Sequence, residues 1–381
     1  MNPITLLQPP RIVFGDGCAV MAAGFLAGRR VRRALMVSSS HVLPHLGELR
    51  SAFDKAGVVL VDVSPVDSEP TMARFEQVLE SVRKEKVEAV LGVGGGSVID
   101  MAKLLAGLRD GRQSIREVVG IDQLQGRNLL LACMPTTAGT GAEVSPNAIL
   151  LDETDSLKKG VVSAHLVPDA AYVDPVMTWT TPPEVTASTG MDALTHCIEA
   201  YANKFAHPVV DEQALRGIRL ISGNLLRAVR NGRDAEARSA LALGSLYGGL
   251  CLGPVNTAAV HALAYPLGGR YHVAHGVSNA LLLPHVLEFN FPAAADRYAD
   301  VAEAMGVHRN GSSLSTAELG VGWLKRLVQD CGVPQRLSQL GIPRQALPEM
   351  ARAAMQVVRL LKNNPRPLSE QDALQIYEAA Y

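Results

Sequence analysis

The chain has 381 residues, of which 48% are hydrophobic, and its 36 basic and 37 acidic residues give a net charge of −1. This length leads us to expect two domains with a large core. The charge balance excludes nucleic acid and anionic membranes as main partners, and no apolar run approaches the roughly 20 residues that a membrane-spanning helix needs.

The N-terminal segment MNPITLLQPPRIVFGDG has no basic stretch followed by an apolar one, so export is not expected. The five cysteines are scattered, odd in number and without a CxxC pair, which predicts buried thiols in a reducing cytoplasm; they are Cys18, Cys133, Cys197, Cys251 and Cys331. Cys197 adjoins His196, but neighbours on a helix point about 100° apart, so we expect Cys197 to lie in the core.

The first half of the chain alternates strand and helix patterns. Short apolar runs predict buried strands at 34–38, 58–63, 89–93 and 129–134. Residues 70–84 have apolar positions at helical spacing, namely Met72, Phe75, Val78, Leu79 and Val82. This alternation predicts a mainly parallel, doubly wound sheet.

From about Pro183 the pattern changes to long helical segments, such as 192–202 and 212–229, with few strand signals. The segment PDAAYVDPVMTWTTPPEV, with its prolines and threonines, is the expected hinge. We therefore expect an α/β domain over 1–182 and a helical domain over 183–381.

A glycine-rich turn follows the third predicted strand. Gly94, Gly95 and Gly96 separate that strand from Ser97, where a helix is expected to open. Glycines let the backbone approach a pyrophosphate, and a helix N-terminus supplies free N–H donors. The run is not the G-x-G-x-x-G fingerprint, so an ordinary tight turn is an equal alternative on these residues alone.

A second loop, MPTTAGTGAEVSPNAIL, follows the next predicted strand. Thr136, Thr137 and Thr140 are small hydroxyl residues that suit phosphate or ribose, while the alternative is a capping segment with Thr140 or Ser145 as N-cap. Together the two loops favour one nucleotide lying across adjacent strand ends, where open α/β sheets bind ligands.

Four residues of the second half form a candidate metal site. Asp192 and His196 are four apart, so on a helix they project from one face, and His261 and His275 follow fourteen residues apart. One carboxylate and three imidazoles suit Fe²⁺ or Zn²⁺. Single histidines are more often structural, but small neighbours leave room here for metal and substrate: Gly190, Ala193, Ala262, Ala274 and Gly276.

Five segments of the chain resemble the iron-containing (group III) alcohol dehydrogenase family. They are GGGSVIDMAK, MPTTAGTGAEVSPNA, LVPDAAYVDPVMTWTTPPEVTASTGMDALTHCIEAY, HALAYPLGGRYHVAHGVSNALLLPHV and NNPRPLSEQDALQIYEAAY. The match begins at PPRIVFGDG and covers nearly the whole chain in order. The resemblance implies a dehydroquinate synthase-like fold, with an α/β dinucleotide-binding domain, an all-helical metal domain and an active site in the cleft between them.

The resemblance also implies roles for single residues. It makes Asp192, His196, His261 and His275 the metal ligands. It assigns pyrophosphate and nicotinamide binding to Gly95, Gly96, Ser97 and Asp100. It places further cofactor or substrate contacts at Thr136, Thr137, Thr140, Asn147, Lys159 and Thr178.

Two positions depart from the family pattern. Many members have an aspartate that binds the adenosine ribose and repels a 2′-phosphate, where this chain has Ser39 in MVSSS, so the chain is expected to accept NADP as well as NAD. Many members also have a second histidine four residues after the first, where this chain has Tyr265. The proton relay is therefore open, with His261, Tyr265 and the nearby His272 as the candidate catalytic residues.

We expect a metal-dependent, NAD- or NADP-linked oxidoreductase that interconverts a small alcohol and its aldehyde, acting in the cytoplasm as a homodimer or higher homo-oligomer. The metal would act as a Lewis acid, and hydride would move to or from the nicotinamide.

Three alternatives stay open. The first is an enzyme like maleylacetate reductase, or a hydroxyacid dehydrogenase, that acts on an anionic oxo substrate, with Arg270 and His272 as cationic contacts or Arg270 as a surface residue. The second resembles dehydroquinate synthase or glycerol-1-phosphate dehydrogenase. The third is a metal-binding protein without activity. The segments GMDALTHCIEAY and NPRP favour the alcohol dehydrogenase.

Overall fold

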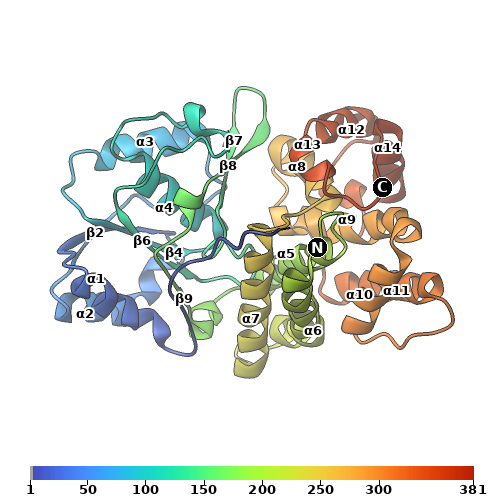
Figure 1. Ribbon diagram of the computed structural model, residues 1–381, viewed down its shortest axis with the longest axis horizontal. Coiled ribbons are helices and arrows are strands. Elements are labelled where there is room, and N and C mark those ends of the chain that lie inside the picture. Colours follow the sequence, from blue (N-terminus) through green and yellow to red (C-terminus); the bar gives the residue numbers. More distant parts are fainter. Residues whose placement is uncertain (1–2) are drawn as a thin grey trace. The chain divides into compact units, whose positions relative to one another are not determined.

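The computed structural model describes residues 3–381. They form two compact units (Figure 1): an α/β unit of Leu6–Thr137 and Gly141–Trp179, and a helical unit of residues 3–5, Ala138–Thr140 and Thr180–Tyr381. The helical unit thus begins three residues before the predicted boundary at 183, and it includes two segments that we had assigned to the first domain. The boundary differs because Arg238 on a later helix donates a hydrogen bond to the carbonyl of Thr181.

The α/β unit is built on a parallel sheet with the strand order β1-β9-β6-β4-β2-β3. Its strands are β1 Ile12–Phe14, β2 Arg33–Ser38, β3 Val59–Asp62, β4 Ala89–Gly94, β6 Leu130–Pro135 and β9 Ala170–Val173. A second, three-stranded sheet in the order β5-β8-β7 contains β5 Gly120–Ile121, β7 Asn147–Asp152 and β8 Leu157–Val162. The four predicted strands correspond to β2, β3, β4 and β6, and the predicted fold class is confirmed.

Alternating side chains bury both faces of the main sheet. In β2, Leu35 and Val37 enter one hydrophobic cluster, while Ala34 and Met36 enter the other. Figure 1 shows α1 and α2 on one side of these strands and α3 and α4 on the opposite side. These helices are α1 Met21–Gly28, α2 Gly47–Lys55, α3 Met72–Val82 and α4 Gly96–Leu108.

The expected hinge is wrong in part, because its first half belongs to the sheet. The segment contains β9 and the 3-10 helix η5 Pro175–Thr178. Strand β9 pairs with β1 on one side and with β6 on the other. Both partner strands are distant in the sequence, and the apolar run of β9 is short and flanked by prolines and threonines. The sequence pattern therefore did not indicate a strand here.

The helical unit surrounds one hydrophobic core. Its helices are α5 Pro183–Tyr201, α6 Pro208–Arg230, α7 Ala235–Leu252, α8 Ala259–Tyr271, α9 His275–Asn290, α10 Ala295–Ala304, α11 Ser313–Asp330, α12 Leu347–Met355, α13 Val358–Leu361 and α14 Glu370–Ala379. Helices α5 and α6 begin before the predicted segments because Pro183 and Pro208 suit the first turn of a helix. Within residues 3–381, no helix combines the length and apolar content needed to cross a membrane.

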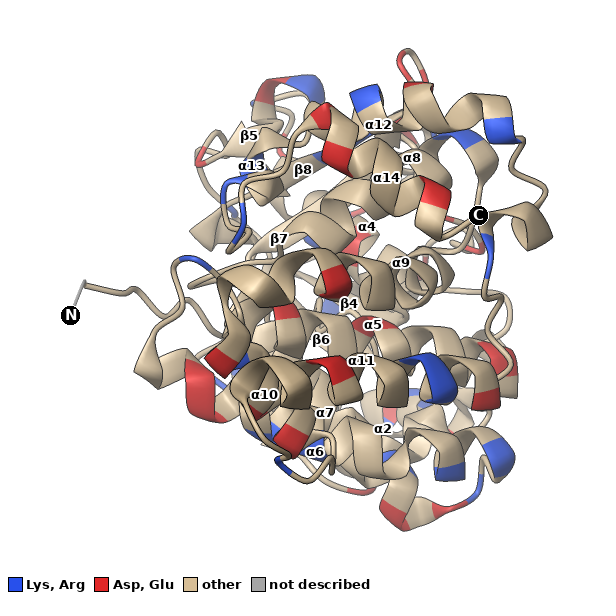
Figure 2. Ribbon diagram, turned by 90° about the vertical axis from the view of Figure 1, so that its right-hand side faces the viewer, with Lys and Arg blue, Asp and Glu red and all other residues tan. Residues whose placement is uncertain are grey.

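Charged residues of both signs are interspersed along the outer helices of this unit. Figure 2 shows acidic and basic positions on α10, α11 and α12, whereas the charged positions of α14 are all acidic. All five cysteines are buried and unpaired, and Cys197 lies in the main core. The sequence-based expectation of buried thiols is therefore confirmed.

Candidate functional site

The glycine-rich turn joins β4 to α4 as predicted. Gly95 is the N-cap of α4, and Ile99 donates the first helical hydrogen bond to its carbonyl. A side chain at Gly94 would not fit, because a Cβ there would lie 2.6 Å from a methyl group of Val98. The tight turn brings the free N–H groups of the first turn of α4 to the carboxyl end of β4, where an anion can bind.

Two neighbouring strands add hydroxyl groups at the same edge. Thr136 donates a backbone hydrogen bond to Gly94 as β6 ends, and the Thr137 hydroxyl lies 3.5 Å from where a Cβ of Gly95 would be. Ser39 directly follows β2, which pairs with β4 on the other side. The structure therefore brings Thr136, Thr137 and the glycine turn together, with Ser39 at the end of the adjacent strand.

The sequence analysis missed a carboxylate close to Ser39. The backbone N–H of Ser40 donates to Asp67 Oδ1 at 2.7 Å, and this hydrogen bond lowers the pKa of Asp67. Asp67 lies in the loop after β3, 28 residues from Ser39 in the sequence. No local motif marks this acid, since only the pairing of β2 with β3 brings it to the strand end.

Five other predicted cofactor residues lie elsewhere in the fold, and four of them have the partners described next. The carboxylate of Asp100 accepts a hydrogen bond from the backbone of Ile149, and burial raises its pKa to about 6. The Asn147 carbonyl accepts a hydrogen bond from Lys103 at 2.8 Å. Lys159 forms an ion pair with Asp155, and the Thr178 hydroxyl donates to Pro175, while Thr140 belongs to the helical unit. None of these contacts gives the five residues a shared site.

The predicted metal ligands do come together, and we call Asp192, His196, His261 and His275 the Asp–His cluster. Asp192 Oδ1 lies 3.5 Å from Nε2 of His261, 3.5 Å from Nε2 of His275 and 3.8 Å from Nε2 of His196. A separation of about 3.5 Å is that expected between two ligand atoms that each lie about 2.1 Å from one tetrahedral metal ion. Asp192, His261 and His275 form the tightest group.

Burial and mutual charge set the electrostatics of the cluster. Burial disfavours the Asp192 carboxylate, yet the imidazoles of His196, His275 and His261 hold its pKa well below the usual range. Burial lowers the pKa of His196. Burial also opposes protonation of His261, but Glu199 and Asp192 outweigh it and raise its pKa to about 9. The buried carboxylate of Asp192, together with Glu199 bonded to His261, favours a cation at this position.

Glu199 is a carboxylate beside the Asp–His cluster that the sequence analysis missed. Its two oxygens accept hydrogen bonds of 2.6 Å from the backbone N–H of Val260 and from Nδ1 of His261. With Nδ1 bonded to the carboxylate of Glu199, Nε2 of His261 faces Asp192, and it can coordinate a cation once it releases its proton, which is the arrangement of metal-binding histidines. The spacing could have indicated this role, because Glu199 follows His196 by three residues on one helix.

Close packing of two helices places His275. It is the first residue of α9, and the next residue, Gly276, touches α5: a Cβ there would lie 2.2 Å from the carbonyl oxygen of Ser188. The glycine lets the start of α9 pack against Ser188, which lies one helical turn before Asp192 on α5. The His275 side chain is 29% exposed and that of Asp192 is 3% exposed, so the cluster opens on the His275 side.

The candidate proton-relay residues differ in position. The ring centroid of Tyr265 lies 6.4 Å from that of His275, and its hydroxyl accepts a hydrogen bond of 3.4 Å from Arg359. His272 is exposed and ends α8 in a left-handed conformation, with φ of 53°. Arg270 forms a salt bridge of 2.5 Å to Glu349, in agreement with a surface role. Tyr265 is therefore beside the cluster, whereas Arg270 has a partner elsewhere.

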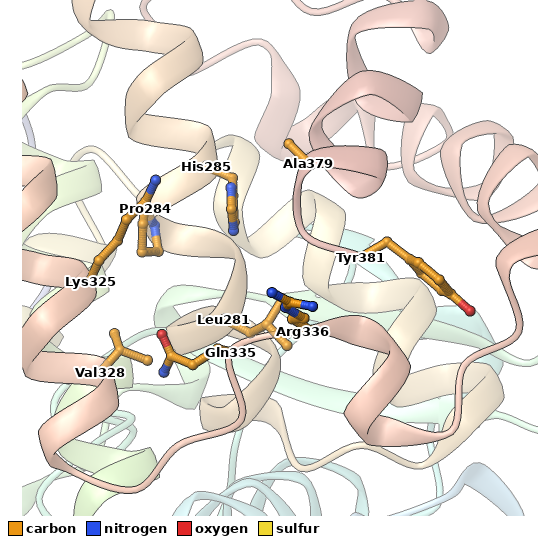
Figure 3. Close-up of a pocket in the computed structure, with 9 residues that line it drawn as sticks. All are labelled: Leu281, Pro284, His285, Lys325, Val328, Gln335, Arg336, Ala379 and Tyr381. Carbon is orange, nitrogen blue, oxygen red and sulfur yellow. The ribbon is translucent and has the colours of Figure 1, made fainter.

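A separate cavity of about 290 Å³ lies in the helical unit (Figure 3). It is lined by Leu281, Pro284, His285, Lys325, Val328, Gln335, Arg336, Ala379 and Tyr381. None of these residues belongs to the Asp–His cluster or to the predicted cofactor residues. The cavity is therefore distinct from the candidate site.

Comparison with known proteins gives matches over nearly the whole chain. The family model described as iron-containing alcohol dehydrogenase matches residues 9–175, and the one described as Fe-containing alcohol dehydrogenase family, C-terminal, matches residues 186–381. The chain is 44% identical over 329 residues to a long-chain-alcohol dehydrogenase 1 of Geobacillus thermodenitrificans, covering 85% of this chain and 82% of that protein.

It is also 37% identical over 373 residues to a 1,3-propanediol dehydrogenase of Citrobacter freundii, covering 97% of this chain and 94% of that one. The crystal structure of a 1,3-propanediol oxidoreductase superposes with a TM-score of 0.96 at 33% identity, covering all of both chains.

Proposed function

The chain belongs to the iron-containing alcohol dehydrogenase family, and from this premise we propose that it interconverts a small alcohol and its aldehyde at an Fe²⁺ ion held by the Asp–His cluster. It is an NAD-linked oxidoreductase of that family. The observation that carries the proposed metal site is the close approach of Asp192, His261 and His275, whose ligand atoms all lie within 4.8 Å of one another, with Nε2 of His196 3.8 Å from Asp192 Oδ1.

The residues present fit such an ion. The cluster supplies one carboxylate oxygen and three imidazole nitrogens, a set that suits Fe²⁺ and also Zn²⁺. When bound, the metal would polarise the substrate oxygen and the nicotinamide would exchange the hydride. Glu199 would fix the ring of His261, while the exposed edge of His275 would leave substrate a way in. Tyr265 would line the substrate position.

One experiment tests this function. Purified protein is reconstituted with Fe²⁺ or Zn²⁺ under argon, its metal content is measured, and a panel of linear and hydroxylated aldehydes is assayed with NADH and with NADPH. We expect one bound metal per chain and aldehyde reduction that a chelator abolishes. Activity that survives complete removal of the metal would contradict the proposal.

For the cofactor, we propose that NADP(H) is accepted beside NAD(H). Ser39 supports this, because it removes the acid expected at the end of β2. Asp67 opposes it, because its carboxylate lies beside Ser40 and would repel a 2′-phosphate bound there. We therefore expect higher activity with NAD(H) and lower but measurable activity with NADP(H).

A second candidate function is the reduction of an aldehyde or oxo acid that carries a carboxylate. Arg359 favours it, since its guanidinium contacts the Tyr265 hydroxyl and, within residues 3–381, forms no ion pair with an acidic residue. A free guanidinium can bind a carboxylate through two hydrogen bonds.

We predict that Arg359→Ala raises KM for a carboxylated aldehyde by about tenfold or more and changes KM for the neutral aldehyde of equal length little. Arg270→Ala is the matched control, because Arg270 is already paired with Glu349. If Arg359→Ala changed KM equally for both aldehydes, Arg359 would not recognise a carboxylate, and a general alcohol dehydrogenase would be the better assignment.

We also propose that the enzyme acts in the cytoplasm as a homodimer or higher homo-oligomer. The five unpaired, buried cysteines support a reducing compartment. Exposed apolar side chains near the edge strand β1, among them Phe14 and Met21, support association of chains. Light scattering coupled to size-exclusion chromatography measures the mass of the assembly.

A further inference from the structure

The carboxamide of Asn279 lies among the proposed metal ligands. Asn279 follows His275 by one turn of α9 and is fully buried. Its Nδ2 lies 2.7 Å from Asp192 Oδ1, 3.1 Å from Nε2 of His261 and 3.2 Å from Nε2 of His275. The contact with Asp192 is much shorter than any contact between Asp192 and a cluster histidine.

The same donor atoms would bind a metal ion. A neutral imidazole with its proton on Nδ1 has one lone pair on Nε2, and that lone pair either accepts a hydrogen bond or coordinates a cation. Nδ2 of Asn279 donates to the oxygen of the buried carboxylate and lies within hydrogen-bonding distance of two such nitrogens, so three atoms share its two N–H groups. Hydrogen bonding by Asn279 and coordination of a metal are therefore alternatives for His261 and His275.

The other end of the carboxamide has no partner. Asn279 Oδ1 is buried and accepts no hydrogen bond from the described residues. A buried carbonyl oxygen without a donor is costly, so hydrogen bonding at Oδ1 does not explain why the carboxamide points its nitrogen towards the cluster. The attraction between the N–H groups and the Asp192 carboxylate explains this orientation.

We propose that Asn279 is a built-in competitor of the metal: its N–H groups compensate the Asp192 carboxylate whenever no cation is bound, and they are displaced from the imidazoles when a cation binds. This rests on the proposed metal site. Asn279 would keep the cluster assembled before loading, since a buried carboxylate without a partner is strongly unfavourable. It would also weaken metal binding, because these hydrogen bonds must break.

The test measures melting temperature with and without Zn²⁺, and Zn²⁺ affinity by competition with a chelator. Zn²⁺ is the probe because it binds such sites more tightly than Fe²⁺ and is not oxidised. The variants are Asn279→Ala and Asn279→Asp, the second keeping the size of the side chain. Asn290→Ala is the control, because Asn290 is also buried on α9 but pairs with Asn364.

We expect both Asn279 variants to melt lower than the wild type without metal and to regain most of the loss with Zn²⁺. Their Zn²⁺ affinity should be tighter by a factor on the order of ten or more, since a charge-assisted hydrogen bond no longer opposes binding. Asn290→Ala should lower both melting temperatures equally and leave the affinity unchanged.

Weaker Zn²⁺ binding in both Asn279 variants, or losses equal with and without metal, would overturn the role of Asn279. A wild type whose melting temperature does not respond to Zn²⁺ would instead overturn the metal site itself. The two failures are therefore distinguishable.

Discussion

At the scale of single residues, the Asp–His cluster is built around the buried carboxylate of Asp192 and the nitrogens beside it. The side chain of His261 is fixed on both sides: Glu199 holds Nδ1, and Nε2 faces Asp192 and Asn279. Such fixed imidazoles bind metals tightly because little order is lost on coordination.

We predict that His261→Ala loses bound metal and most activity while the protein stays folded. Removing one of four ligands should lower metal affinity by at least about tenfold. Metal content measured after reconstitution, with circular dichroism as a check on folding, tests this. His272→Ala is the matched control, since His272 is exposed at the end of the same helix. Full metal content in His261→Ala would show that His261 is not a ligand.

We predict that Ser39→Asp shifts cofactor preference towards NAD(H) by a factor on the order of ten or more, because the added carboxylate repels a 2′-phosphate. Asp67→Asn should shift the preference towards NADP(H), since the acid beside Ser40 is removed. The ratio of kcat/KM for the two cofactors measures both effects. An unchanged ratio in both variants would place the ribose elsewhere.

At the scale of elements, the position of α9 against α5 decides whether the cluster forms. Helix α5 carries Asp192, His196 and Glu199 and is buried along almost its whole length. Helix α9 brings His275 and Asn279 to it, and the glycine after His275 allows the close approach. With His261 on α8, three helices therefore contribute to one site.

We predict that Gly276→Ala lowers metal affinity by about tenfold or more, because the new Cβ would clash with the Ser188 carbonyl and move His275 away from Asp192. Gly223→Ala is the control, since no atom lies within 4 Å of its Cβ position on α6; it should be neutral or slightly stabilising. Melting temperature and metal titration measure both variants. Unchanged affinity in Gly276→Ala would mean that α5 and α9 adjust without moving His275.

At the scale of the whole molecule, buried ionisable groups in the α/β unit make stability depend on pH. Glu143 lies in the loop between β6 and β7 and is only 2% exposed. Burial raises its pKa from 4.5 to about 7, partly opposed by its own backbone N–H and by Lys103. The folded protein therefore holds a proton on Glu143 over a pH range in which the unfolded chain has lost it.

We predict that Glu143→Gln is more stable than the wild type at neutral and alkaline pH. Because the folded pKa is raised, the stabilising proton is fully present below pH 4.5 and is lost as pH rises through about 7. The advantage of the variant should thus grow between these values and level off at about 3 kcal/mol. Melting curves from pH 4 to 9 measure it, with the exposed Glu48→Gln as control. A constant difference across this range would show that Glu143 ionises normally.

The sequence by itself determined the parts that depend on local pattern. Apolar runs of strand length gave β2, β3, β4 and β6, because both faces of a parallel sheet are buried. The i, i+4 spacing put Asp192 and His196 on one face of α5, and glycines marked the turn into α4. Resemblance of long motifs indicated the family, which the comparisons confirm.

Only the tertiary structure decided which distant residues meet. Strand β9 forms because β1 and β6 pair with it, and Asp67 reaches Ser40 through a loop that no motif marks. Arg270 meets Glu349 on α12, while Arg359 on α13 meets Tyr265. Glu199 and Asn279 gain their roles from the packing of α5, α8 and α9. Such contacts follow from close packing between elements, and a one-dimensional pattern does not contain them.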